Sequence, residues 1–311
     1  VTGVQRVLFR SGLRFVSAFL VFIGHYELVK KLSGHDNLCN LHCISISGTL
    51  GVELFFILSG FLITHLLLKE KEKHHGNIAI GRFYVRRILR IWPLYYLIFV
   101  ITFFLLSPFN IALFSFPLST TNILLYALLL PFVAFNLTPV SLPGSVLWSI
   151  GVEECYYLIW PWLMRLKLSL RFFVMLLFVW MCIKSAVTYL PYKVDDASLS
   201  EALFKVAQIF NYIKFECMIV GGMMAYLCYS NSKIVPILFN KSIQVLAYFL
   251  LLFYLFFGLD FTFGKVNAIV YYLAAPLLVA FIGGCIIVNL ALNKNSILSL
   301  QHRWLDKLGQ V

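Results

Sequence analysis

The sequence repeats apolar runs of a length that fits one environment, the hydrocarbon core of a lipid bilayer. A helix needs about 20 apolar residues to cross that core, and the chain contains eight runs near this length. Hydrophobic residues make up 61% of the chain and charged residues 12%, whereas a soluble domain has about 25% charged residues. We therefore predict an all-α polytopic membrane protein and exclude water-soluble classes. The predicted spans lie at about 13–30, 48–68, 91–107, 146–164, 170–190, 207–229, 243–260 and 267–291.

A further apolar run, at about 121–137, is interrupted by Pro131. Basic residues indicate whether it crosses, because short loops rich in Lys and Arg stay in the cytoplasm. Residues 69–90 carry seven basic residues against two acidic ones, and a second basic cluster lies at 165–171. Both clusters can face the cytoplasm only if the segment containing this run crosses an even number of times. We therefore expect eight spans plus a re-entrant or interfacial segment near 121–137, with the N-terminus in the cytoplasm.

The basic surplus and the cysteines suggest no other partner. Lys and Arg number 25 against 13 Asp and Glu, which membrane orientation explains without nucleic-acid binding. The loop after the first span holds His35, Cys39, His42 and Cys43. Their spacing fits no structural zinc pattern, so we expect no metal. The two thiols are expected to be free or joined in an outer-loop disulfide.

Ionisable residues also occur inside the spans, where a charge costs roughly 2.5–3.5 kcal/mol on insertion scales. His25 follows Arg14 by 11 residues, which places it about 16 Å further along the first helix, near the middle of a ~30 Å core. Glu53 and Glu153 reach comparable depths on their own helices. The structural alternative for His25 is a neutral ring bonded to a neighbouring helix. The functional interpretation is a proton-handling or nucleophilic histidine.

The stretch LWSIGVEECYYLIWPW adds a polar stripe to the fourth span. Ser149, Glu153 and Tyr157 recur at every fourth residue and share one helix face, while Glu154 points about 100° away. One buried carboxylate can then meet one buried imidazole. This is the smallest acid–base pair that supports a reaction on a hydroxyl group.

Three further groups have both a structural and a functional interpretation. Arg87 and Arg90 anchor the third span by the positive-inside rule, or they clamp an anion such as phosphate. Ser59, before a glycine, more often serves close helix packing than chemistry. Lys214 and Glu216 at the outer end of the sixth span form either a surface ion pair or part of a site.

Four stretches, in order, resemble the acyltransferase 3 family, the bacterial integral-membrane enzymes that O-acetylate surface glycans. The stretch GLRFVSAFLVFIGH looks like the family's opening helix, whose Arg-x10-His motif falls on Arg14 and His25. GVELFFILSGFLI is similar to its second helix. RRILRIWPLYY carries its Arg-x-x-Arg motif as Arg87 and Arg90.

The fourth stretch, LWSIGVEECYYLIWP, looks like the family's Ser-x-x-x-Glu signature on Ser149 and Glu153. A later stretch, KFECMIVGGMMAY, resembles a weaker motif in which the family more often has Arg where this chain has Lys214. Cys155 stands where the family usually has Gln. The resemblance implies His25 and Glu153 as catalytic residues and Arg14, Arg87 and Arg90 as donor-binding residues. The implied supporting residues are Glu53, Ser59, Ser149, Tyr157, Lys214 and Glu216.

The resemblance also implies a reaction. An acyl group, in the first place acetyl, passes from cytoplasmic acyl-CoA across the membrane to a hydroxyl of an outward-facing glycan, with His25 as base or acyl carrier. Acetyl-CoA is then the donor, and a polysaccharide, lipopolysaccharide or lipid-linked saccharide is the acceptor. The protein would lie in the inner membrane of a bacterium. The alternative is a proton-coupled secondary transporter that uses the buried His, Glu and Arg, but the inverted repeat and paired broken helices typical of such folds are not found in the sequence.

The domain prediction rests on the same resemblance. Residues 1–11 fit poorly with the apolar run after them and resemble a non-native scar. Residues 12–311 are expected to form a single integral-membrane acyltransferase domain. The eight predicted spans would leave it without the last two helices of the ten in the family.

Overall fold

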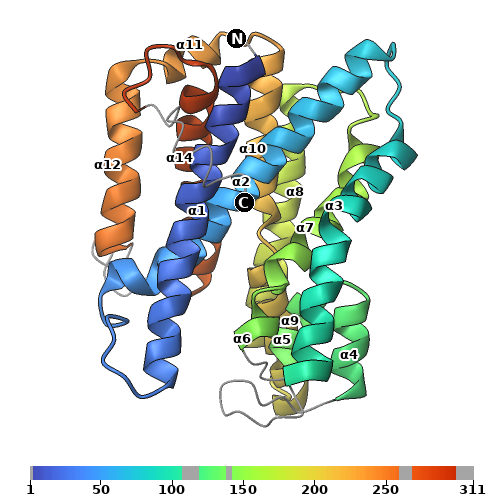
Figure 1. Ribbon diagram of the computed structural model, residues 1–311, viewed down its shortest axis with the longest axis vertical. Helices are drawn as coiled ribbons and strands as arrows, with labels where there is room; N and C mark the ends of the chain where they lie inside the picture. The colour runs from blue at the N-terminus through green and yellow to red at the C-terminus, as the bar shows by residue number, and fades with distance from the viewer. Residues whose placement is uncertain (1–2, 107–118, 138–141, 259–267, 299–311) are drawn as a thin grey trace. The chain divides into compact units, whose positions relative to one another are not determined.

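A computed structural model of the chain describes residues 3–106, 119–137, 142–258 and 268–298 (Figure 1). Within these ranges every regular element is helical, so the predicted all-α class is confirmed. The elements are α1 (Gly3–Leu32), α2 (His42–Lys73), α3 (Ile80–Val100), the π-helix η1 (Ile101–Leu106), α4 (Thr120–Ala127), α5 (Pro131–Leu137), α6 (Leu142–Ser145), α7 (Trp148–Leu163), α8 (Leu170–Tyr189), the 3-10 helix η3 (Leu190–Lys193), α9 (Ala197–Tyr212), α10 (Phe215–Tyr229), α11 (Ile234–Leu238), α12 (Lys241–Phe257) and α14 (Ala268–Leu292).

Among the described residues, five helical stretches are long and apolar enough to cross a bilayer, which confirms a polytopic membrane protein. They are Gly12–Leu32, His42–Lys73, Ile80–Leu106, Leu170–Lys193 and Tyr272–Leu292. The other three predicted spans correspond to the shorter helices α7, α10 and α12, of 16, 15 and 17 residues. These helices are about 23–26 Å long. The predicted loop between the last two spans falls at residues 259–267, outside the described part of the chain.

The predicted span at 207–229 is not one helix. α9 ends at Tyr212, Ile213 has an extended backbone, and α10 begins at Phe215. Lys214 therefore lies in the break between two helices. Glu216 falls in the first turn of α10, where a carboxylate is favoured by the positive end of the helix dipole.

The apolar run at 121–137 forms two short helices, α4 and α5, of 8 and 7 residues. Each is about 11–12 Å long, too short to cross a ~30 Å core, as predicted from the loop charges. Leu129 takes φ = 61° between them. Pro131 then begins α5, where its missing N–H costs no helical hydrogen bond.

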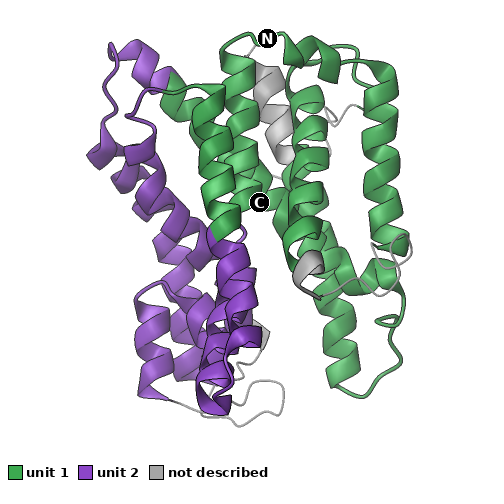
Figure 2. Cartoon of the chain, turned by 180° about the vertical axis from the view of Figure 1, so that it is seen from behind, with its two compact units in different colours: residues 1–68, 168–182, 215–311 green, residues 69–167, 183–214 purple. Residues whose placement is uncertain are grey.

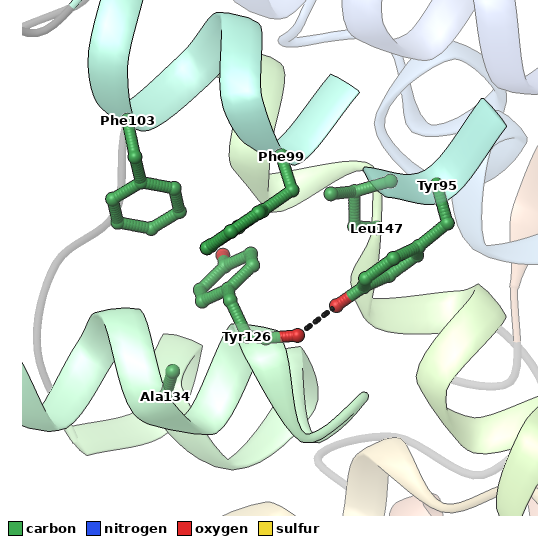
Figure 3. Packing of buried hydrophobic residues seen from close by; sticks show 6 residues of the cluster. All are labelled: Tyr95, Phe99, Phe103, Tyr126, Ala134 and Leu147. Atoms are coloured by element: carbon green, nitrogen blue, oxygen red, sulfur yellow. Dashed lines mark hydrogen bonds between the residues drawn. The ribbon is translucent and has the colours of Figure 1, made fainter. Parts of the chain in front are cut away.

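A buried aromatic cluster fixes this pair of short helices against α3 (Figure 3). The Tyr95 hydroxyl donates to the carbonyl oxygen of Tyr126 at 2.7 Å, and the Tyr96 hydroxyl donates to that of Ala127 at 2.9 Å. These carbonyls lie in the last turn of α4, where the helix itself supplies no donor. The cluster consists of Tyr95, Phe99, Phe103, Tyr126, Ala134 and Leu147.

The C-terminal end of α7 is capped by a lysine from the end of α2. Lys71 Nζ donates to the carbonyl oxygens of Met164 at 3.0 Å, Arg165 at 3.3 Å and Leu166 at 2.8 Å. A cation is favoured at the negative end of a helix dipole. The lysine therefore has a structural role beyond its place in the basic loop.

The chain divides into two compact units (Figure 2). Unit 1 comprises residues 1–68, 168–182 and 215–311, and unit 2 comprises residues 69–167 and 183–214. Both units are therefore assembled from segments that are separated in the sequence.

Unit 1 is held together by a reciprocal glycine contact between α2 and α10. A Cβ added at Gly60 would overlap the carbonyl oxygen of Met218, and one added at Gly221 would overlap that of Ile57. The two backbones therefore touch directly, as small residues permit in membrane helices. This crossing fixes the helix that carries Glu53.

Candidate active site

His25 is held in a defined tautomer by its own helix. Its Nδ1 lies 2.8 Å from the carbonyl oxygen of Val21, one turn earlier in α1. Because a carbonyl oxygen only accepts hydrogen bonds, Nδ1 carries the proton, and a neutral ring then has its lone pair on Nε2. That nitrogen can accept a proton or attack an acyl carbon. The bond to a neighbouring helix that a purely structural histidine would make is replaced, at Nδ1, by this contact within α1.

The backbones of α1 and α2 meet beside this histidine. A Cβ added at Gly24 would come within 2.8 Å of the backbone nitrogen of Gly48, and one added at Gly48 would lie 4.0 Å from His25 Nδ1. The ring therefore sits at a tight helix crossing. Such packing restricts its rotamers and holds Nε2 in one orientation.

Two residues after His25, Glu27 ties the following loop to α1. Its carboxylate accepts from the backbone N–H of Leu38 at 2.7 Å and from Lys30 Nζ at 3.1 Å. The sequence interpretation did not single out this residue. Its signal is the pairing with a lysine three positions later at the end of a predicted span.

The other candidates of unit 1 lie along α1 and α2. Glu53 is only 1% exposed, so its carboxylate is buried as the sequence predicted. Arg14 and Ser59 are partly buried. The packing role expected beside Ser59 is confirmed, because Gly60 is in direct backbone contact with α10.

In unit 2, Tyr157 joins two of the predicted site residues. Its hydroxyl donates to Glu153 Oε2 at 3.2 Å, one turn away on α7. The guanidinium carbon of Arg87 lies 5.1 Å from the Tyr157 ring centroid and 5.6 Å from that of Phe83, within the range of cation–π attraction. The structure thus brings Arg87, Tyr157 and Glu153 together.

The rest of the polar stripe on α7 has separate partners. Trp92 Nε1 donates to Glu154 Oε2 at 3.2 Å, so the second carboxylate faces α3. Ser149 Oγ donates to the carbonyl oxygen of Val146 at 3.4 Å. The stripe therefore splits into a Glu153–Tyr157 pair, a Glu154 contact to the neighbouring helix and a serine bonded to the backbone.

The arginines of α3 also differ from one another. Arg86 forms an ion pair of 3.2 Å with Glu70. Arg87 is partly buried between aromatic rings, and Arg90 is exposed. A guanidinium that stacks on rings can still direct its N–H groups at an anion.

Glu216 is not a surface residue, so the surface ion pair offered as its structural interpretation is wrong. Its side chain is 0% exposed, and its Oε2 accepts from Trp180 Nε1 at 2.7 Å. The physical reason is that α10 begins at Phe215, which puts Glu216 inside a packed helix and not in a loop. Trp180 belongs to the same unit, so the indole compensates part of the cost of burying this carboxylate.

The outer loop gives no support to a zinc site. Among the residues that the structure describes, no three His, Cys, Asp or Glu side chains are grouped closely enough to hold a metal ion. Cys39 and Cys43 are both free thiols. Of the two alternatives for this pair, the structure has the free thiols.

Comparison with known proteins identifies the family. The sequence profile of the acyltransferase 3 family, described as an acyltransferase domain, matches residues 11–311. The chain belongs to the acyltransferase 3 family. The resemblance stated from its motifs is therefore confirmed.

Curated relatives in this family are named as O-acetyltransferases. The chain is 33% identical over 156 residues to the peptidoglycan O-acetyltransferase of Listeria monocytogenes, covering 44% of this chain and 24% of that protein. It is 31% identical over 157 residues to a putative peptidoglycan O-acetyltransferase of Bacillus subtilis, covering 46% and 25%. A putative O-acetyltransferase of Staphylococcus aureus is 30% identical over 154 residues, covering 44% and 25%.

The chain thus spans about a quarter of the length of these relatives. No solved structure matches it. The family's motif residues fall in both units: Arg14 and His25 in unit 1, and Arg87 and Glu153 in unit 2. The pairing of His25 with Glu153 therefore stays a prediction.

One buried residue of α8 was missed by the sequence interpretation. Lys184 is 0% exposed, although it lies within a predicted span. A lysine among apolar residues of a membrane span is costly, as His25 and Glu53 are. Its sequence signal was the charge itself, four residues after Trp180.

Proposed function

We propose that this acyltransferase domain moves an acyl group, in the first place acetyl, from an acyl-CoA on the cytoplasmic side to a hydroxyl of a glycan outside. The observation that carries the proposal is the family match over residues 11–311. Two relatives named for peptidoglycan make that glycan the first acceptor to test, before lipopolysaccharide or another polysaccharide. The family assignment favours acyl transfer over the transporter alternative.

His25 is the proposed base or acyl carrier. In the direct route, Nε2 takes the proton of the acceptor hydroxyl as its oxygen attacks the thioester carbonyl, and the departing CoA thiolate receives that proton. In the carrier route, Nε2 attacks first, CoA leaves as the thiol, and the acceptor hydroxyl then takes the acyl group from the ring. The proton on Nδ1, bonded to Val21, supports both routes because it leaves the lone pair on Nε2.

Glu153 is proposed to balance the positive charge that develops on the imidazole. Arg14, Arg87 and Arg90 are the proposed donor site, since guanidinium groups bind phosphates bidentately. The stacking of Arg87 on two rings supports this role, because stacking occupies the face of the guanidinium and not its N–H groups. Under the same proposal the protein lies in the inner membrane of a bacterium, with its N-terminus in the cytoplasm.

The test is glycan O-acetylation in cells that lack their own O-acetyltransferases and express this protein. We expect ester-linked acetyl groups with the unsubstituted protein, and their loss in His25→Ala and Glu153→Gln at equal membrane expression. His35→Ala is the matched control, because His35 is an exposed histidine of the outer loop. Acetyl esters that persist in His25→Ala would remove this histidine from the mechanism.

A further inference from the structure

Tyr157 contacts both halves of the proposed machinery in unit 2. It lies on α7, is 4% exposed and packs edge-on against Phe83 of α3, with ring centroids 6.5 Å apart. Water therefore has little access to its ring or to the hydrogen bond of its hydroxyl. The polar contacts of such a side chain are stronger than they would be in solvent.

The ring of Tyr157 supports Arg87. The guanidinium carbon lies 5.1 Å from the Tyr157 centroid and 5.6 Å from the Phe83 centroid. Stacking uses the flat face of the guanidinium and none of its N–H donors. The two rings therefore hold the arginine in a way that is compatible with an anionic ligand at its edge.

The hydroxyl of Tyr157 acts on a different group. It donates to Glu153 Oε2 at 3.2 Å, which restricts the rotamers of that carboxylate. Glu154 is held separately, by Trp92 Nε1 at 3.2 Å. The tyrosine therefore orients one of the two adjacent carboxylates and not the other.

We propose that Tyr157 is a positioning residue that couples the donor site to the catalytic carboxylate: its ring holds Arg87 and its hydroxyl holds Glu153. The inference rests on the proposed function, which assigns donor binding to Arg87 and charge balance to Glu153. Phe83 provides an internal comparison, because it contacts Arg87 but has no polar group with which to bond Glu153.

The experiment measures acetyl transfer by the purified protein in lipid vesicles, with acetyl-CoA varied and a soluble peptidoglycan fragment as acceptor. Tyr157→Phe keeps the ring and removes the hydroxyl, so kcat is expected to fall by roughly 10–100-fold with the KM for acetyl-CoA unchanged. Phe83→Leu removes one ring beside Arg87, so that KM is expected to rise by roughly 2–10-fold with kcat unchanged. Tyr157→Leu should show both effects.

The outcomes separate this inference from the proposed function. Transfer that Tyr157→Phe leaves unchanged, or a change in the same parameter in both single variants, would overturn the coupling role alone. No transfer by the unsubstituted protein, or full activity in Glu153→Gln, would overturn the proposed function and this inference with it. A loss confined to kcat in Tyr157→Phe and to KM in Phe83→Leu supports the inference.

Discussion

The glycine contact between α2 and α10 makes a sharp prediction for the Gly60→Ala variant. The added Cβ would overlap the Met218 carbonyl oxygen and lie 2.7 Å from the Met218 Cα. Carbon atoms in contact are about 3.5 Å apart, so the two helices must separate locally by roughly 0.8 Å. The obstructing atoms are backbone, so no rotamer change relieves the overlap. We expect a cost of about 3 kcal/mol, the upper part of the range for overpacking.

Thermal unfolding in mild detergent, followed by a thiol-reactive dye, measures this cost. Cys217 is buried beside the contact, so its labelling, located by mass spectrometry, reports opening of the α2–α10 crossing. The midpoint of Gly60→Ala should fall by roughly 5–10 °C. Gly81→Ala is the matched control, because nothing lies within 4 Å of its added Cβ. Equal midpoints in the two variants would refute the reasoning.

Three further predictions concern single contacts. Lys71→Met should lower stability by about 1–2 kcal/mol, since it leaves carbonyls at the end of α7 without their donor, and thermal unfolding measures the loss. Tyr95→Phe should cost about 1–3 kcal/mol in the same assay, because the buried carbonyl of Tyr126 loses its partner. The pKa of Asp196 is lowered by the N–H of Leu199 and by a serine hydroxyl. The α9 cap is therefore fully present above the usual aspartate pKa and is lost as the pH falls through the lowered value, which amide hydrogen exchange at the start of α9 detects.

The features of the fold that could be predicted from the sequence are those set by local pattern. Long apolar runs predicted the helices, and loop charges predicted that 121–137 does not cross. Glu153 and Tyr157 were predicted to share a face, and they form a hydrogen bond, because both lie on one helix at a spacing of four residues.

The contacts that were missed join different helices. Trp92 bonds Glu154 across the α3–α7 contact, and no spacing within either helix specifies that partner. The break at Ile213 was missed because hydropathy does not register an extended backbone between two apolar stretches. The burial of Glu216 was missed for the same reason, since the break places this residue in the first turn of a packed helix.

The interleaving of the two units limits how such proteins can recombine. Unit 2 consists of residues 69–167 and 183–214, and the unit boundaries after Leu68 and Cys182 fall inside the continuous helices α2 and α8. A single genetic crossover therefore cannot exchange one unit while leaving the other from one parent. A hybrid with intact units requires both segments of unit 2 to be exchanged together, so new combinations of the two units arise only through paired events.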